Sequence, residues 1–112
     1  MKDDNEKMMS NNLEPCCTLA ITYENRDRLV TMFKALSHPV RFEILQFLLA
    51  HPSCITKDVV DALPLSQATV SQHIKILREA GWVASEAKCQ ATCHWLDNEN
   101  IAWFKAVVGE IF

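Results

Sequence analysis

Five cysteines are the residues of this chain best suited to chemistry. Cys16 and Cys17 are adjacent and follow a proline in a polar stretch, Cys54 stands alone, and Cys89 and Cys93 flank a short polar segment. The first twelve residues lack the apolar run of a signal peptide, which favours a reducing compartment. An odd number of thiols there does not fit a disulfide framework. Metal binding or redox chemistry is therefore expected for at least some of them.

Length and composition are those of one small globular domain. The chain has 112 residues, of which 49% are hydrophobic and 22% charged, enough for one core and too few for two. Its longest apolar stretch, residues 44–50 with Gln46 inside it, is far shorter than the roughly 20 residues that span a bilayer. We therefore expect a soluble, cytoplasmic protein with no membrane partner.

The net charge of −3 argues against indiscriminate binding to nucleic acid, but the acidic residues are unevenly placed. Many lie near the two ends, and none lies between Ala62 and Arg78, a segment that contains His73 and Lys75. This distribution permits a local basic face.

The chain divides into an arm and a domain. Residues 1–20 are polar with little periodicity and carry the adjacent cysteines, whereas residues 21–112 have the pattern of one folded unit. From Tyr23, apolar residues recur at three- and four-residue spacing, which predicts a helix to about residue 36. The residues that recur at this spacing are Leu29, Val30, Phe33 and Leu36.

Two shorter helical segments follow. Pro39 suits the first turn of a helix, so a second helix is predicted from there to about Ala50. Thr56 is placed to cap a third helix over residues 57–63, which Pro64 ends.

A fourth helix is predicted between Ser66, a favoured N-cap residue, and Gly81, which suits a left-handed C-cap. The third and fourth helices, joined by a short turn, make a helix-turn-helix. Two short strands, residues 82–84 and 92–96, then enclose a polar tip and form a β-hairpin, or wing.

The last helix, residues 98–111 after the capping residue Asp97, is apolar round most of its circumference. One small core cannot cover that much apolar surface, so a second copy of the chain is expected to cover the rest. The predicted fold is mainly α with a small β-hairpin: a winged helix-turn-helix with dimerising terminal helices.

The fourth helix has the composition of a DNA-reading helix. Its apolar residues fall on one face, and the opposite face carries amide, hydroxyl and basic groups: Gln67, Ser71, Gln72, Lys75 and Arg78. Amides can pair with adenine in the major groove, and hydroxyls hold phosphates. A polar helix face is ordinary by itself, but its position between a short capped helix and a hairpin favours DNA binding.

Two segments, MFKALSHPVRFEIL and LSQATVSQHIKILREAGWV, resemble the ArsR/SmtB family of metal-responsive bacterial repressors. The likeness covers about Leu29 to Asp97. It implies a homodimer held by the helices over residues 24–36 and 98–111, with operator DNA bound by the fourth helix and the wing. The DNA contacts that it implies are Ser66, Gln67, Thr69, Ser71, Gln72 and His73. His73 is equally well interpreted as a partly buried helix residue that is hydrogen-bonded to the backbone.

Two metal-site patterns of that family are missing here. Cys-x-Cys-Asp at the start of the third helix is replaced by Ile55, Lys57 and Asp58, and no histidine follows Asp97 for a zinc site on the last helix. What remains is an N-terminal cysteine pair with a lone cysteine after the second helix. This arrangement resembles a subgroup of arsenite-sensing repressors, although Pro15 interrupts that subgroup's pattern.

The resemblance implies that the inducer binds Cys16, Cys17 and Cys54. Three thiolates suit a soft, three-coordinate ion such as As(III) or Sb(III), whereas zinc prefers four ligands. No organic cofactor is expected.

Other interpretations stay open at this point. Cys54 could be a small buried apolar residue, and Cys89 with Cys93 could form a second thiol site or be incidental. The same fold could sense another soft metal ion or thiol oxidation. A small thiol enzyme is the remaining class, but two glycines and no Cys-x-x-Cys argue against it, so we expect no enzymatic activity.

Overall fold

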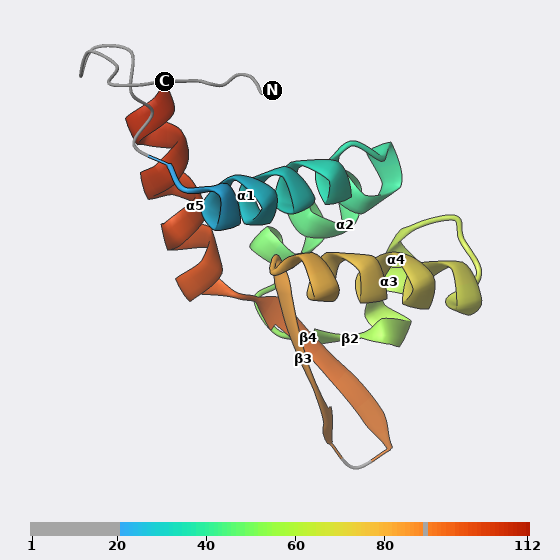
Figure 1. The fold of residues 1–112 in the computed structure, drawn as a ribbon. Helices are drawn as coiled ribbons and strands as arrows, with labels where there is room; N and C mark the ends of the chain where they lie inside the picture. The colour runs from blue at the N-terminus through green and yellow to red at the C-terminus, as the bar shows by residue number, and fades with distance from the viewer. Residues whose placement is uncertain (1–20, 89) are drawn as a thin grey trace, which may run out of the picture.

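The computed structural model describes residues 21–88 and 90–112, so the arm with Cys16 and Cys17, and Cys89 at the wing tip, lie outside the described residues. The described part is helical with one small sheet (Figure 1). Its elements are α1 (Tyr23–Leu36), α2 (Pro39–Ala50), β2 (Cys54–Ile55), α3 (Thr56–Ala62), α4 (Gln67–Ala80), β3 (Val83–Lys88), β4 (Ala91–Leu96) and α5 (Asn98–Ile111). This architecture confirms the predicted fold class. None of the described helices is long and apolar enough to cross a membrane.

Local signals set most helix ends where the sequence predicted them. Pro39 opens α2, the Ser66 hydroxyl accepts from the Thr69 N–H at the start of α4, and the Asp97 carboxylate accepts from the Asn100 N–H at the start of α5. Gly81 ends α4 with φ 103°, a left-handed conformation that other residues adopt only with strain.

The start of α3 differs from the prediction. Thr56 does not cap the helix; it is its first residue, and the Asp58 carboxylate instead accepts from the Ile55 N–H at 3.0 Å. The Thr56 hydroxyl lies 2.8 Å from Nε2 of His94 on β4. The Thr56 hydroxyl, which the local sequence assigned to the helix cap, is therefore bonded to a residue that is distant in sequence.

The sheet has three strands in the order β2-β4-β3, not the two of a simple hairpin. β3 and β4 pair antiparallel from Val83↔Leu96 to Lys88↔Ala91, and they are longer than predicted. β2 adds to the other edge of β4 with Cys54 opposite His94. The base of the wing is therefore tied to the segment that leads into α3.

The core lies where α1, α2, α3 and α4 meet the base of the sheet. Its largest fully buried side chains are Met32, Ile44, Leu48, Val59, Val70, Ile74, Leu77 and Val83. Trp82 is also buried, and its indole N–H donates to the Met32 carbonyl at 2.8 Å, which satisfies the polar group of this large ring.

Only some of the apolar residues that predicted α1 face the core of this chain. Leu29 is buried, but the other fully covered positions are Met32 and Ala35, whereas Val30 and Phe33 stay 44% and 45% exposed. The helix is apolar on more than one face, and spacing alone does not say which face meets the core.

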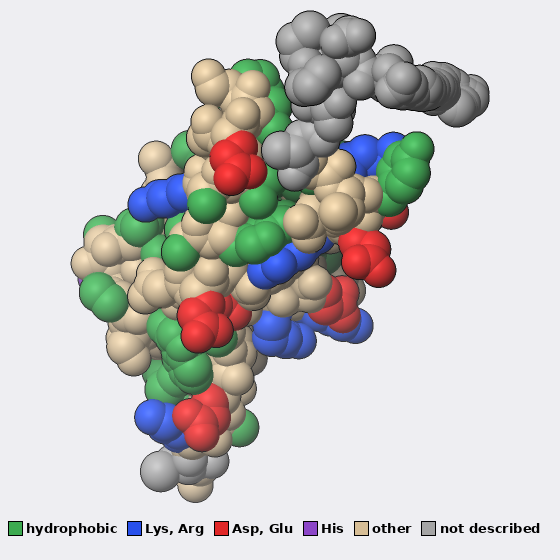
Figure 2. Space-filling view, turned by 60° about the vertical axis from the view of Figure 1, so that its left-hand side comes forward, with side chains coloured by type: hydrophobic (Ala, Val, Ile, Leu, Met, Phe, Trp, Pro, Cys, Tyr) green, Lys and Arg blue, Asp and Glu red, His purple; other side chains and the backbone are tan. Residues whose placement is uncertain are grey.

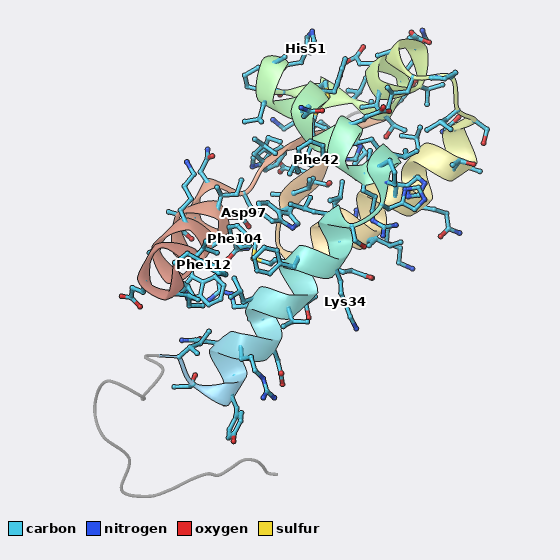
Figure 3. All side chains as sticks on the ribbon, turned by 90° about the horizontal axis from the view of Figure 1, so that it is seen from above. Lys34, Phe42, His51, Asp97, Phe104 and Phe112 are labelled. Atoms are coloured by element: carbon cyan, nitrogen blue, oxygen red, sulfur yellow. The ribbon has the colours of Figure 1, made fainter. Side chains whose placement is uncertain are left out.

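No residue of α5 is fully buried within this chain. Phe104 points toward α1 (Figure 3), where its ring lies 5.1 Å from that of Phe33 and 4.8 Å from that of Trp82. At the C-terminal end, Ile111 and Phe112 are 40% and 93% exposed. Figure 2, turned so that the α5 side comes forward, shows hydrophobic side chains in the middle of this face among scattered charged ones.

Candidate functional site

The exposed surface of α4 carries five of the six side chains predicted to contact DNA. Val70, Ile74 and Leu77 are buried and hold the helix on the core. The exposed members of the predicted set, which lie on α4 and its N-cap and which we call the α4 reading face, are Ser66, Gln67, Thr69, Ser71 and Gln72. They offer hydroxyl and amide groups, the chemistry that reads base edges and holds phosphates.

Ser66 and Thr69 are exposed, and they also hold the N-terminal turn of α4 by hydrogen bonds. The Ser66 Oγ accepts from the Thr69 N–H at 3.2 Å and lies 3.0 Å from the Thr69 Oγ1. These bonds fix the first turn of α4 and leave Gln67, Ser71 and Gln72 as the members of the reading face without such a capping bond among the described residues.

His73 lies apart from the reading face. It is half-buried, with its ring centre 4.7 Å from that of His38 and its Nδ1 3.4 Å from Nη1 of Arg41. Arg41 in turn donates from Nε to the Ala35 carbonyl at 2.6 Å. Burial, followed by the charges of His38 and Arg41, lowers the pKa of His73. This contact joins α4 to the start of α2, as the partly buried interpretation anticipated, although the partners are side chains.

His94 is the buried polar side chain between α4 and the wing, only 3% exposed. Its Nε2 lies 2.8 Å from the Thr56 hydroxyl and its Nδ1 2.7 Å from the Ser85 hydroxyl. Burial, and then the charge of Arg78, lower the pKa of His94, so the ring is neutral at physiological pH. A neutral ring has one donor and one acceptor, and each has a hydroxyl partner here.

Cys54 is buried at 5% exposure within the core cluster. Burial raises the pKa of its thiol to about 11, and the nearby Asp58 carboxylate and Cys93 thiol add to this effect. The interpretation of Cys54 as a buried apolar residue therefore describes this state of the chain. A ligand could reach the thiol only if the β2 segment moved.

The remaining thiols are only partly described. Cys93 is a free, half-buried cysteine of β4, opposite Ile55 on one side and Glu86 on the other. Its proposed companion Cys89 lies outside the described residues, as do Cys16 and Cys17. Among residues 21–88 and 90–112, no three His, Cys, Asp or Glu side chains are placed to hold a metal ion.

Sequence reasoning missed the polar cluster of Thr56, Ser85 and His94. The three residues are joined by hydrogen bonds over 38 and 9 positions of the chain. Alternation along β4 could have placed His94 on one face of a strand, but nothing local indicates that this face is covered by α4.

Known proteins that are similar to this chain are helix-turn-helix proteins, in agreement with the arrangement of α3 and α4. A family model described as a helix-turn-helix domain matches residues 36–86. The chain is 37% identical over 71 residues to the HTH-type transcriptional repressor SmtB of Mycobacterium tuberculosis, which covers 63% of this chain and 52% of that protein. The chain thus spans about half the length of the curated relatives it matches first.

Two solved structures share the fold. An ArsR-like transcriptional regulator from Rhodococcus sp. RHA1 superposes with a TM-score of 0.71 at 22% identity, over 79% of this chain and 82% of the other. A homodimeric winged helix-turn-helix DNA-binding domain of a possible ArsR-family regulator from Mycobacterium bovis superposes with a TM-score of 0.64 at 22% identity, over 77% and 79%.

Proposed function

We propose that this chain is a member of the ArsR/SmtB family of winged-helix regulators and acts as a transcriptional repressor, not as an enzyme. It binds operator DNA as a homodimer in the cytoplasm and releases the DNA when As(III) or Sb(III) binds its cysteine thiolates. The observation that carries DNA binding is the α4 reading face, exposed and polar, on a helix that three buried apolar residues fix to the core.

The α1–α5 surface supports a homodimer. Val30 and Phe33 of α1 and Ile111 of α5 are each at least 40% exposed, and no residue of α5 is fully buried. Large exposed apolar side chains gathered on two helices are typical of an interface. A twofold dimer would present two copies of α4 to half-sites about one helical turn (~34 Å) apart.

The state of Cys54 supports arsenous acid over a divalent cation as inducer. A cation such as Zn²⁺ must release the thiol proton into water, which a pKa of about 11 opposes. Arsenous acid supplies its own base, because each hydroxide that a sulfur replaces takes the thiol proton and leaves as water. The exchange is neutral in protons, so the raised pKa of Cys54 does not weaken it at equilibrium.

DNA binding is tested with variants of the reading face. Gln67→Ala and Ser71→Ala should each weaken binding to a duplex that the wild-type chain selects from a random pool, by roughly 5- to 100-fold for a lost base contact. Lys105→Ala on α5 is the control and should bind as the wild type does. Unchanged affinity in both reading-face variants would move the DNA contact to another segment.

Inducer binding is tested by replacing each thiol with serine. Loss of any member of the proposed clamp should leave repression intact and abolish release by arsenite; its members are Cys16, Cys17 and Cys54. Cys89→Ser and Cys93→Ser should release normally and serve as matched controls. Release that survives loss of Cys54 would contradict the clamp, and release by Cd²⁺ or peroxide alone would identify a sensor of another soft metal or of thiol oxidation.

A further inference from the structure

A polar cavity of about 230 Å³ lies between α4 and the wing, on the flank of the reading face. Apart from Ile74, the side chains that line it are polar: Thr56, Ser71, Lys75, Arg78, Thr92 and His94. They come from three elements that are distant in sequence, α3, α4 and β4. The cavity therefore exists only in the folded chain.

The charge of this cavity is positive and uncompensated by its lining. Lys75 and Arg78 contribute two cations, and no acidic side chain lines the cavity. The ion pairs among the described residues are formed by Arg26, Lys57 and Lys88, and neither Lys75 nor Arg78 takes part in one. Two cations and three hydroxyls around one space are the donor set that binds an oxyanion.

The buried His94 orients one of these hydroxyls, that of Thr56, so that it can donate a hydrogen bond into the cavity. In the tautomer with hydrogen on Nε2, His94 donates to the Thr56 oxygen at 2.8 Å and accepts from the Ser85 hydroxyl at 2.7 Å. The Thr56 hydrogen is then free to point into the cavity. The opposite tautomer would direct only lone pairs of Thr56 at an anion, so an anion selects the first.

We propose that this cavity is an oxyanion site that receives one backbone phosphate of duplex DNA. The inference rests on the proposed DNA-binding function. Ser71 belongs both to the reading face and to the cavity, so a phosphate held here would lie directly beside bases read by α4. Thr56, which local sequence assigned to a helix cap, is in this arrangement a phosphate donor positioned by His94.

The test compares two exposed lysines on helices, Lys75 of α4 and Lys105 of α5. Affinity for the selected duplex and for single-base variants of it is measured between low and moderate salt. Lys75→Ala should weaken binding roughly tenfold by loss of a charged hydrogen bond. The factor should be similar for every sequence, because a phosphate carries no base information, and the slope of log K against log salt should fall by about 1. Lys105→Ala should change neither.

Thr56→Val, which keeps the side-chain shape, isolates the hydroxyl. It should lower affinity roughly tenfold or more, as for the loss of one hydrogen bond to a charged group, and leave the salt slope unchanged, because no protein charge is removed. A thermal melt checks that the variant is folded. The proposal is overturned if Lys75→Ala behaves as Lys105→Ala does, or if folded Thr56→Val binds DNA as the wild type does.

A second measurement separates DNA phosphate from free phosphate. Inorganic phosphate is titrated into the DNA-free chain at constant ionic strength while amide resonances are followed. Selective shifts at Thr56, Lys75 and Arg78 are expected; shifts without any effect of Lys75→Ala on DNA affinity would assign the site to a free oxyanion and overturn the DNA assignment. If the wild type binds no duplex at all, the proposed function fails, while the titration still decides whether the cavity binds an oxyanion.

Discussion

The reactivity of Cys54 can be calculated from its surroundings and then measured. Burial with nearby Asp58 and Cys93 raises the pKa of Cys54 from 9.0 to about 11. At pH 7 this shift lowers the thiolate population about 100-fold. A more basic thiolate is also a better nucleophile, and with a Brønsted coefficient of 0.4–0.5 two pKa units restore roughly 6- to 10-fold of the rate. Ionisation alone should therefore slow thiol–disulfide exchange by roughly 10- to 16-fold, and burial should slow it further.

The assay uses a chain in which Cys54 is the only cysteine, with serine at the other four positions. Its reaction with an aromatic disulfide reagent at pH 7 is followed by absorbance, once in the folded chain and once in urea. The folded chain should react at least tenfold more slowly. A matched chain that retains only Cys93, which is half-buried, should be less protected. Equal rates for folded and unfolded Cys54 would refute the burial argument and would mean that β2 opens freely.

Two further predictions concern the dimer and the buried histidine. Val30→Lys combined with Ile111→Lys should convert the dimer to monomers in sedimentation while far-ultraviolet circular dichroism stays unchanged, because both side chains are exposed in the single chain; a persistent dimer would place the interface elsewhere. Because burial lowers the pKa of His94 below its ordinary 6.5, its neutral form stabilises the fold fully above pH 6.5, and this contribution is lost as the pH falls below that value. Thermal midpoints measured from pH 8 to pH 5 should fall less in His94→Gln than in the wild type. His73→Gln should also reduce the fall, because the pKa of His73 is lowered too. A pH profile of His94→Gln identical to that of the wild type would contradict this assignment.

Most helix boundaries, though not the start of α3, could be predicted because local chemistry determines them. Pro39 fixes the start of α2, and Ser66 and Gly81 fix the ends of α4 through one cap bond and one left-handed residue. These signals act within a few positions of the chain. The α4 reading face followed from the same helix, because three buried apolar residues decide which side faces out.

The parts that could not be predicted depend on distant pairing. β2 has two residues and no periodicity, and it exists as a strand only because β4 lies beside it. The hydroxyl of Thr56 would suit a helix cap equally well, and its choice of His94 is decided by the tertiary fold. The exposure of Val30 and Phe33 could not be predicted either, because an apolar residue at helical spacing can face either its own core or a second copy of the chain.

The same distant pairing offers a short route from the proposed inducer thiol to the DNA surface. Cys54 is the register partner of His94 across β2 and β4, and Thr56, two residues further along, is hydrogen-bonded to the His94 ring. A ligand that draws Cys54 out of the core must disturb this pairing and with it the wall of the cavity beside α4. Allosteric couplings are typically 1–3 kcal/mol, and a ligand achieves them only by binding the two states differently. Two hydrogen bonds to His94, at about 0.5–1.5 kcal/mol each, already span that range. Release of DNA on metalloid binding would then require the loss of one preorganised phosphate donor set, without a large rotation of one subunit against the other.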